Sequence, residues 1–112
     1  MKSILILALL TISLSANAQS LRSECENYYY ATGNVKLHEY TAIVSWSKIS
    51  DSSLEKLENI IYDDFAVLSE KNIQDKTIFK IKENNSTDAM GYNILLQDLV
   101  DMKVRVSCTY NI

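Results

Sequence analysis

The chain has 112 residues, of which 47% are hydrophobic and 22% are charged, and its formal net charge is −3. This length allows one domain, because independent domains average about 100–150 residues. Two glycines and no proline exclude collagen-like, Pro-rich and Gly-rich segments, and the high hydrophobic share excludes a wholly disordered chain.

Residues 1–18 have the three parts of a secretory signal peptide. Lys2 supplies the positive start, an apolar stretch follows, and residues 16–18 (Ala-Asn-Ala) fit the small-x-small rule for cleavage. The apolar stretch is shorter than the roughly 20 residues that a membrane-spanning helix needs. We therefore expect cleavage before Gln19, a single mature domain over residues 19–112, and a periplasmic or secreted bacterial protein.

Removing these 18 of the 112 residues leaves 94, and the loss of Lys2 changes the net charge from −3 to −4. A mildly acidic domain without a basic run argues against nucleic acid and against anionic lipid as partners. No later stretch is apolar over a spanning length, so we expect no membrane span after signal cleavage.

The first elements of the mature chain are a helix and a strand. Residues 20–26 favour a helix that is followed by extended chain, although residues 24–32 also fit a strand that ends in three tyrosines before a Gly33-Asn34 turn. Residues 40–47 alternate between apolar or aromatic and other side chains with a period of two, which predicts a strand.

Residues 51–71 predict one amphipathic helix packed on a core. Its apolar residues at helical spacing are Leu54, Leu57, Ile61, Phe65 and Leu68. Ser52 and Glu55 have the spacing of a capping box, which would satisfy free backbone donors at the helix start.

The second half of the chain predicts a strand, a helix and a strand. Residues 77–82 and 103–112 alternate with a period of two, and the latter strand directs Cys108 toward the core. Residues 87–99 favour a helix despite Gly91, with a strand as the open alternative. The polar segment before this helix contains overlapping glycosylation sequons at Asn84 and Asn85, which matter only in a eukaryotic secretory pathway.

These elements predict an α+β fold. Strands with one polar face each are typical of antiparallel sheets, whereas wholly parallel sheets bury both faces. We expect a small two-layer sandwich, with a three- to four-stranded, mainly antiparallel sheet and one long and one short helix on one face.

The two cysteines predict a structural disulfide. An exported protein meets an oxidising compartment, and Cys25 and Cys108 allow a single intramolecular pairing. The bond would close a loop of 84 residues, which the chain-entropy model values at about 4.5 kcal/mol. Intermolecular pairing and free thiols are the alternatives.

The sequence contains no recognisable catalytic, metal or cofactor motif. His38 is the only histidine, and its neighbour Glu39 would point to the opposite face of a strand. The side chains of the adjacent residues Asp63 and Asp64 would also point in different directions on a helix, so they could not easily bind one cation together. The sequence contains no calcium-binding loop. With glycine only at 33 and 91, phosphate-binding loops are excluded. We expect a protein that is not an enzyme and that has no cofactor or metal. A small carboxylate-dependent hydrolase ranks third, behind the two binding hypotheses given below.

Two features favour binding to another protein. Tyr28, Tyr29 and Tyr30 form an aromatic cluster, although they would also serve to cover the disulfide. Residues 51–75 contain seven acidic residues and two lysines, and we predict a partner-binding face with Glu55, Glu58 and Asp63. Such a face would attract a cationic partner. The leading hypothesis is a small exported binding protein, and its concrete alternative is an immunity or inhibitor protein that blocks a toxin or a lysozyme-like enzyme.

Overall fold

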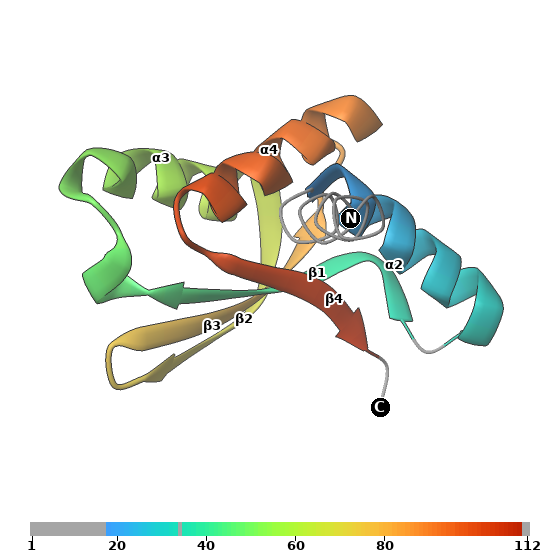
Figure 1. Cartoon of the computed structure of the whole chain (residues 1–112), viewed down its shortest axis with the longest axis horizontal. Coiled ribbons are helices and arrows are strands. Elements are labelled where there is room, and N and C mark those ends of the chain that lie inside the picture. Colours follow the sequence, from blue (N-terminus) through green and yellow to red (C-terminus); the bar gives the residue numbers. More distant parts are fainter. Residues whose placement is uncertain (1–17, 34, 111–112) are drawn as a thin grey trace, which may run out of the picture.

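The computed structural model describes residues 18–33 and 35–110 (Figure 1). Residues 1–17 of the predicted signal peptide lie outside the described residues. The elements in chain order are α2 (Ala18–Thr32), β1 (Val35–Ser45), the 3-10 turns η1 (Trp46–Lys48) and η2 (Asp51–Ser53), α3 (Leu54–Asn59), the π turn η3 (Ile60–Asp64), β2 (Phe65–Ile73), β3 (Lys76–Glu83), α4 (Ala89–Asp101) and β4 (Arg105–Tyr110).

The four strands form one antiparallel sheet in the order β2-β3-β1-β4. The series β1-α3-β2-β3-α4-β4 is a double split β-α-β unit, the topology named after ferredoxin. α3 and α4 lie on one face of the sheet, and α2 packs beside them against β1 and α4 (Figure 1). The structure therefore confirms the predicted small two-layer α+β sandwich.

The core lies between the sheet and the helices. In β1, Tyr40, Ala42 and Val44 are fully buried, and their partners in β3 are Ile81, Phe79 and Thr77. The alternate residues of both strands point to the opposite, open face of the sheet. The period of two in the sequence thus identified the buried side of both central strands correctly.

The prediction of one helix over residues 51–71 is wrong after Asp64. Phe65 has an extended backbone, with φ −118° and ψ 163°, and it begins the edge strand β2. Leu57, Ile61 and Phe65 are all buried, so the apolar stripe is real. Phe65 completes the stripe from a strand, however, because the following residues pair with β3 through a two-residue hairpin turn.

Two local details of this region also differ from expectation. Leu68 is 51% exposed and lies at an irregularity in the pairing of β2 with β3. The predicted capping box is absent: α3 has Ser53 at its N-cap without a side-chain cap bond, and the Ser52 hydroxyl instead lies 3.3 Å from that of Ser50.

The first helix is longer than predicted, since α2 continues to Thr32 instead of ending near residue 26. Its end is set by Gly33, which has φ 70° and donates its amide to the carbonyl of Tyr29. Glycine adopts this left-handed conformation without steric cost, as is common at helix C-termini.

The helix predicted for residues 87–99 is confirmed as α4, which Asp88 caps by accepting a 2.8 Å bond from the Gly91 amide. The structure also explains why a glycine lies inside this helix. A Cβ atom at position 91 would collide with the side chain of Thr87.

The disulfide prediction is confirmed. Cys25 and Cys108 are bonded, with their Cα atoms 5.7 Å apart and a sequence separation of 83. The bond links α2 to β4 and is buried at Cys25. It therefore attaches the additional N-terminal helix covalently to the last strand of the sheet.

Candidate functional site: an acidic groove between α3 and α4

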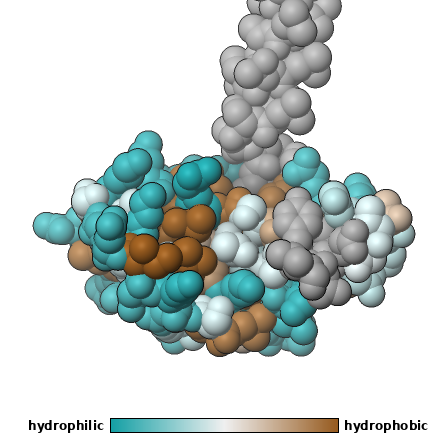
Figure 2. All heavy atoms as spheres, turned by 90° about the horizontal axis from the view of Figure 1, so that it is seen from below, coloured by the Kyte–Doolittle hydropathy of each residue, from teal (hydrophilic) through white to brown (hydrophobic). Residues whose placement is uncertain are grey.

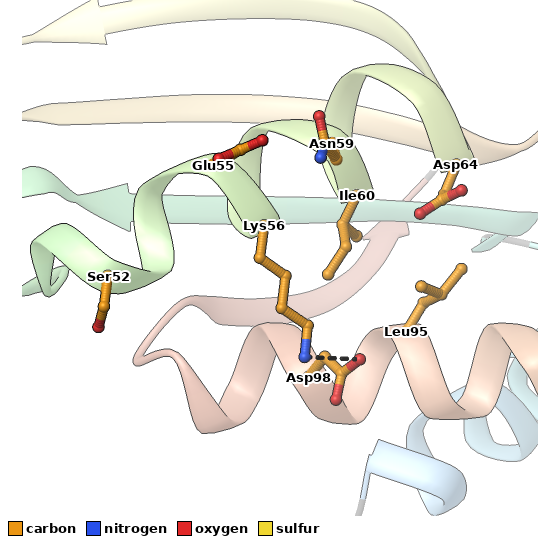
Figure 3. Close-up of a pocket in the computed structure, with 8 residues that line it drawn as sticks. All are labelled: Ser52, Glu55, Lys56, Asn59, Ile60, Asp64, Leu95 and Asp98. Atoms are coloured by element: carbon orange, nitrogen blue, oxygen red, sulfur yellow. Dashed lines mark ion pairs between the residues drawn. The ribbon is translucent and has the colours of Figure 1, made fainter.

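A groove with a volume of about 380 Å³ separates the α3–η3 segment from α4 (Figure 3). We call it the acidic groove. It is lined by Ser52, Glu55, Lys56, Asn59, Ile60, Asp64, Leu95 and Asp98. In Figure 3, Lys56, Ile60 and Asp64 extend toward α4, and Leu95 and Asp98 extend from α4 toward them. The groove thus combines an apolar pair with charged groups from two helices.

The charge of the groove is negative because three carboxylates outnumber one ammonium group. Lys56 Nζ lies 3.5 Å from Asp98 Oδ2 and forms the only ion pair among the described residues of the groove. Its side chain is 61% exposed, so water screens this pair and its contribution to stability is below about 1 kcal/mol. Glu55 and Asp64 carry no ion pair with any described residue, and the groove can accept another cation.

Only part of the predicted acidic face contributes to this groove. Glu55 lines it, whereas Glu58 and Asp63 are exposed and do not. Asp64 and Asp98 were missed as binding residues. Asp64 belongs to the acidic segment 51–75 but is not among the three residues predicted to bind a partner, and Asp98 belongs to a separate element. No local pattern could place Asp98 opposite α3, because that proximity depends on how both helices pack on the sheet.

A second polar cluster joins α2 to the sheet. Arg22 lies within hydrogen-bond distance of Glu26, His38 and Glu83, and His38 Nε2 lies 2.8 Å from Glu26 Oε2. His38 has φ 60° at the irregularity in the β1–β4 pairing, and its ring faces α2 residues. His38 is therefore part of a structural cluster between α2 and the central strand β1. The bond to Glu83 raises the pKa of Arg22 above its ordinary value, so the guanidinium stays charged.

The three predicted tyrosines lie on the C-terminal half of α2. The side chains of these residues are exposed: Tyr28 by 42%, Tyr29 by 39% and Tyr30 by 75%. The rings of Tyr29 and Tyr30 meet edge to face, with their centroids 5.4 Å apart. Tyr28 lines a second cavity of about 540 Å³ between α2 and β4, next to Cys108. Tyr28 therefore lies next to the disulfide, whereas Tyr30 projects into solvent. The structure does not bring them to the acidic groove.

Among the described residues, no group of three or more histidine, cysteine or acidic side chains is arranged to hold a metal ion. Within the same part of the chain, none of the helices combines the length and apolar character needed to cross a bilayer. Comparison of the chain with protein-family models, with curated proteins and with solved structures gave no match. The topology alone carries no function, because unrelated activities share such folds.

Proposed function

We propose that this protein is an exported binding protein without catalytic activity, and that it binds a cationic group of another protein in the acidic groove. The observation that carries the proposal is the groove itself, in which three carboxylates and a single lysine line a hollow together with the apolar side chains of Ile60 and Leu95. Export is supported by the signal-like N-terminus and by the disulfide, which is typical of oxidising compartments.

The dimensions and chemistry of the groove suit a single projecting lysine or arginine side chain. Ile60 and Leu95 would contact the aliphatic part of such a side chain, and the carboxylates would meet its charged end. A bound cation would compete with Lys56 for Asp98 at little cost, since the Lys56 side chain is 61% exposed and its ion pair is weak. Complementary charge would also accelerate association and make it sensitive to salt.

The concrete form of this function is inhibition of a cationic enzyme, such as a toxin or a lysozyme-like hydrolase. The groove lies between elements fixed by buried residues, among them Leu57, Ile60 and Leu96. A preformed site loses little conformational entropy on binding, as inhibitors require. The test is the lysis of bacterial cell walls by a cationic lysozyme with and without the protein; unchanged lysis would remove this form of the proposal.

The general proposal is tested by affinity capture from a bacterial envelope extract at low and high salt. The groove variant is Asp64→Asn/Asp98→Asn, and the matched control is Glu58→Gln/Asp63→Asn. Both variants lose two negative charges at the helical layer, but only the first changes the groove. We expect a basic protein to be retained by the wild type and the control at low salt and lost by the groove variant. Equal retention by both variants, or no retained basic protein, would contradict the proposal.

A further inference from the structure

The sheet has a second face that the helices leave open. Because residues paired across antiparallel strands share a face, the register defines its rows. From β2 through β3 and β1 to β4, the central row is Lys71, Ile78, Ile43 and Arg105, and the next row is Ser69, Lys80, Thr41 and Ser107. Two half-buried isoleucines therefore lie at the middle of this face with a cation at each end of their row.

This face is basic although the whole chain is acidic. We define the basic sheet face as the two isoleucines with five exposed cations, namely Lys71, Lys76, Lys80, Lys82 and Arg105. None of the five forms an ion pair with another residue in the described part of the chain. Figure 2, seen from this side, shows hydrophobic atoms surrounded by hydrophilic ones. An apolar centre with a charged rim is the usual anatomy of a protein interface.

The opposite side of the molecule has the complementary character. Residues 51–64 and 88–101 contain eight acidic residues and a single lysine. On α4, Tyr92, Leu96 and Leu99 are buried against the rest of the domain. At 100° per residue, Met90, Ile94 and Asp101 lie on the other side of the helix. We call these three residues the α4 stripe. Met90 and Ile94 are 66% and 58% exposed, so the stripe presents two large apolar side chains to solvent.

We propose that the α4 stripe of one copy of this chain docks on the basic sheet face of the next copy. Met90 and Ile94 would cover Ile43 and Ile78, and the acidic groups of the helical layer would meet the lysines at the rim. The two surfaces lie on opposite sides of the two-layer sandwich (Figure 1). Such a head-to-tail contact is heterologous, so it extends into open chains instead of closing as a symmetric dimer.

The chemistry of the basic sheet face favours this occupant over other anions. The rows of the face contain no aromatic side chain among the described residues, and stacking on aromatic rings is the usual means of binding single-stranded nucleic acid. Its two central isoleucines are half-buried, and Ile73 at the β2 edge is the single exposed isoleucine that the register places on this face, whereas insertion into a lipid surface requires several projecting apolar side chains. Met90 and Ile94 supply the apolar part of the complement, and Asp101 with the other acidic residues of the helical layer supplies the charged part.

The experiment is analytical ultracentrifugation of the oxidised protein, purified after export, over a range of protein concentrations at low and high salt. We expect the average mass to rise with concentration without a plateau at the dimer, and to return to the monomer at high salt. Lys80→Glu and Ile94→Lys should each weaken association at least about tenfold. The matched controls Lys48→Glu and Tyr30→Lys lie outside both surfaces and should leave it unchanged.

Mixing the two variants tests the head-to-tail arrangement directly. Lys80→Glu retains the α4 stripe, and Ile94→Lys retains the basic sheet face, so an equimolar mixture should form a species that stops at the dimer. A wild type that stays monomeric at every concentration would overturn the proposal, as would equal effects of the variants and their controls. A monomer whose binding to phosphatidylglycerol vesicles or to an oligonucleotide is lost in Lys80→Glu would also overturn it and would assign the face to that ligand. Neither variant alters a residue lining the acidic groove, so failure here is independent of the proposed function.

Discussion

Arg22 on α2 forms a two-pronged ion pair with Glu83 at the end of β3, 61 positions away in the sequence. Arg22 Nε lies 2.9 Å from Glu83 Oε2, and Nη2 lies 3.1 Å from Oε1. The hydroxyl of Tyr40 donates a 2.8 Å bond to the same Oε2. Burial, together with this bond to Glu83, raises the pKa of Tyr40 above its ordinary value. Together with the disulfide, this cluster holds α2 on the sheet.

Replacing Glu83 by glutamine should therefore destabilise the protein strongly. The side chains of Arg22 and Glu83 are only 14% and 6% exposed, so the variant removes the closest counter-charge of a nearly buried guanidinium and leaves it only the longer, 3.4 Å pair with Glu26. The expected loss of unfolding free energy is about 3–5 kcal/mol, measured by urea denaturation. The matched control is Lys56→Ala, which breaks an exposed pair and should cost less than about 1 kcal/mol. Equal effects of the two substitutions would contradict the structural role of Glu83.

Removal of the disulfide should have a comparable effect. Cys25→Ala/Cys108→Ala frees a loop of 84 residues in the unfolded chain, which the chain-entropy model values at about 4.5 kcal/mol. Since small domains have about 5–15 kcal/mol of stability, we expect a large decrease of Tm in calorimetry. Reduction of the wild type should give a similar decrease, which controls for the packing of the alanines. A Tm that responds to neither change would refute this contribution.

Tyr92→Phe should loosen the segment between β3 and α4. The buried Tyr92 hydroxyl donates to Asn84 Oδ1 at 2.7 Å and accepts from the amides of Asn84 and Ser86 at 2.9 and 3.1 Å. Without it these amides lose an acceptor, at a cost of about 1–3 kcal/mol. Hydrogen exchange should show faster exchange at the amides of residues 84 and 86.

The control for this variant is Tyr62→Phe. Its hydroxyl bonds to Glu70, but the side chain is 49% exposed and water can replace the bond. We expect its unfolding free energy to change by less than about 1 kcal/mol. Unchanged exchange at residues 84 and 86 in Tyr92→Phe would show that the hydroxyl does not order this segment.

Asp75 in the β2–β3 turn should contribute to the loss of stability in acid. Its carboxylate accepts a 3.0 Å bond from the Ser47 amide, and bonds from Ser47 lower its pKa below the ordinary value of 3.8. A lowered pKa in the folded state means that the contribution is complete above about pH 4 and is lost as the pH falls through the folded pKa. Tm measured from pH 7 to pH 2 should fall less steeply below pH 4 in Asp75→Asn than in the wild type. Parallel curves would contradict this assignment.

The sequence by itself determined the disulfide, the two-layer class and most of the strands. Two cysteines leave one intramolecular pairing, and the alternation around Tyr40, Phe79 and Val106 reports directly which side of each strand is buried. Residues 87–99 were predicted as a helix for the same reason, since a helical period is a local property, and the structure has α4 at Ala89–Asp101. Such patterns depend on neighbours along the chain.

Tertiary structure decided the features that depend on distant residues. Phe65 has the spacing of a helical residue, but the pairing of residues 65–73 with β3 makes this segment a strand. The acidic groove exists because packing on the sheet brings Asp98 to the residues around Asp64. The net charge of −3 is a sum and conceals the separation between acidic helices and the basic sheet face. Composition counts charges, whereas only the fold assigns each side chain to a surface, and electrostatic recognition acts between surfaces.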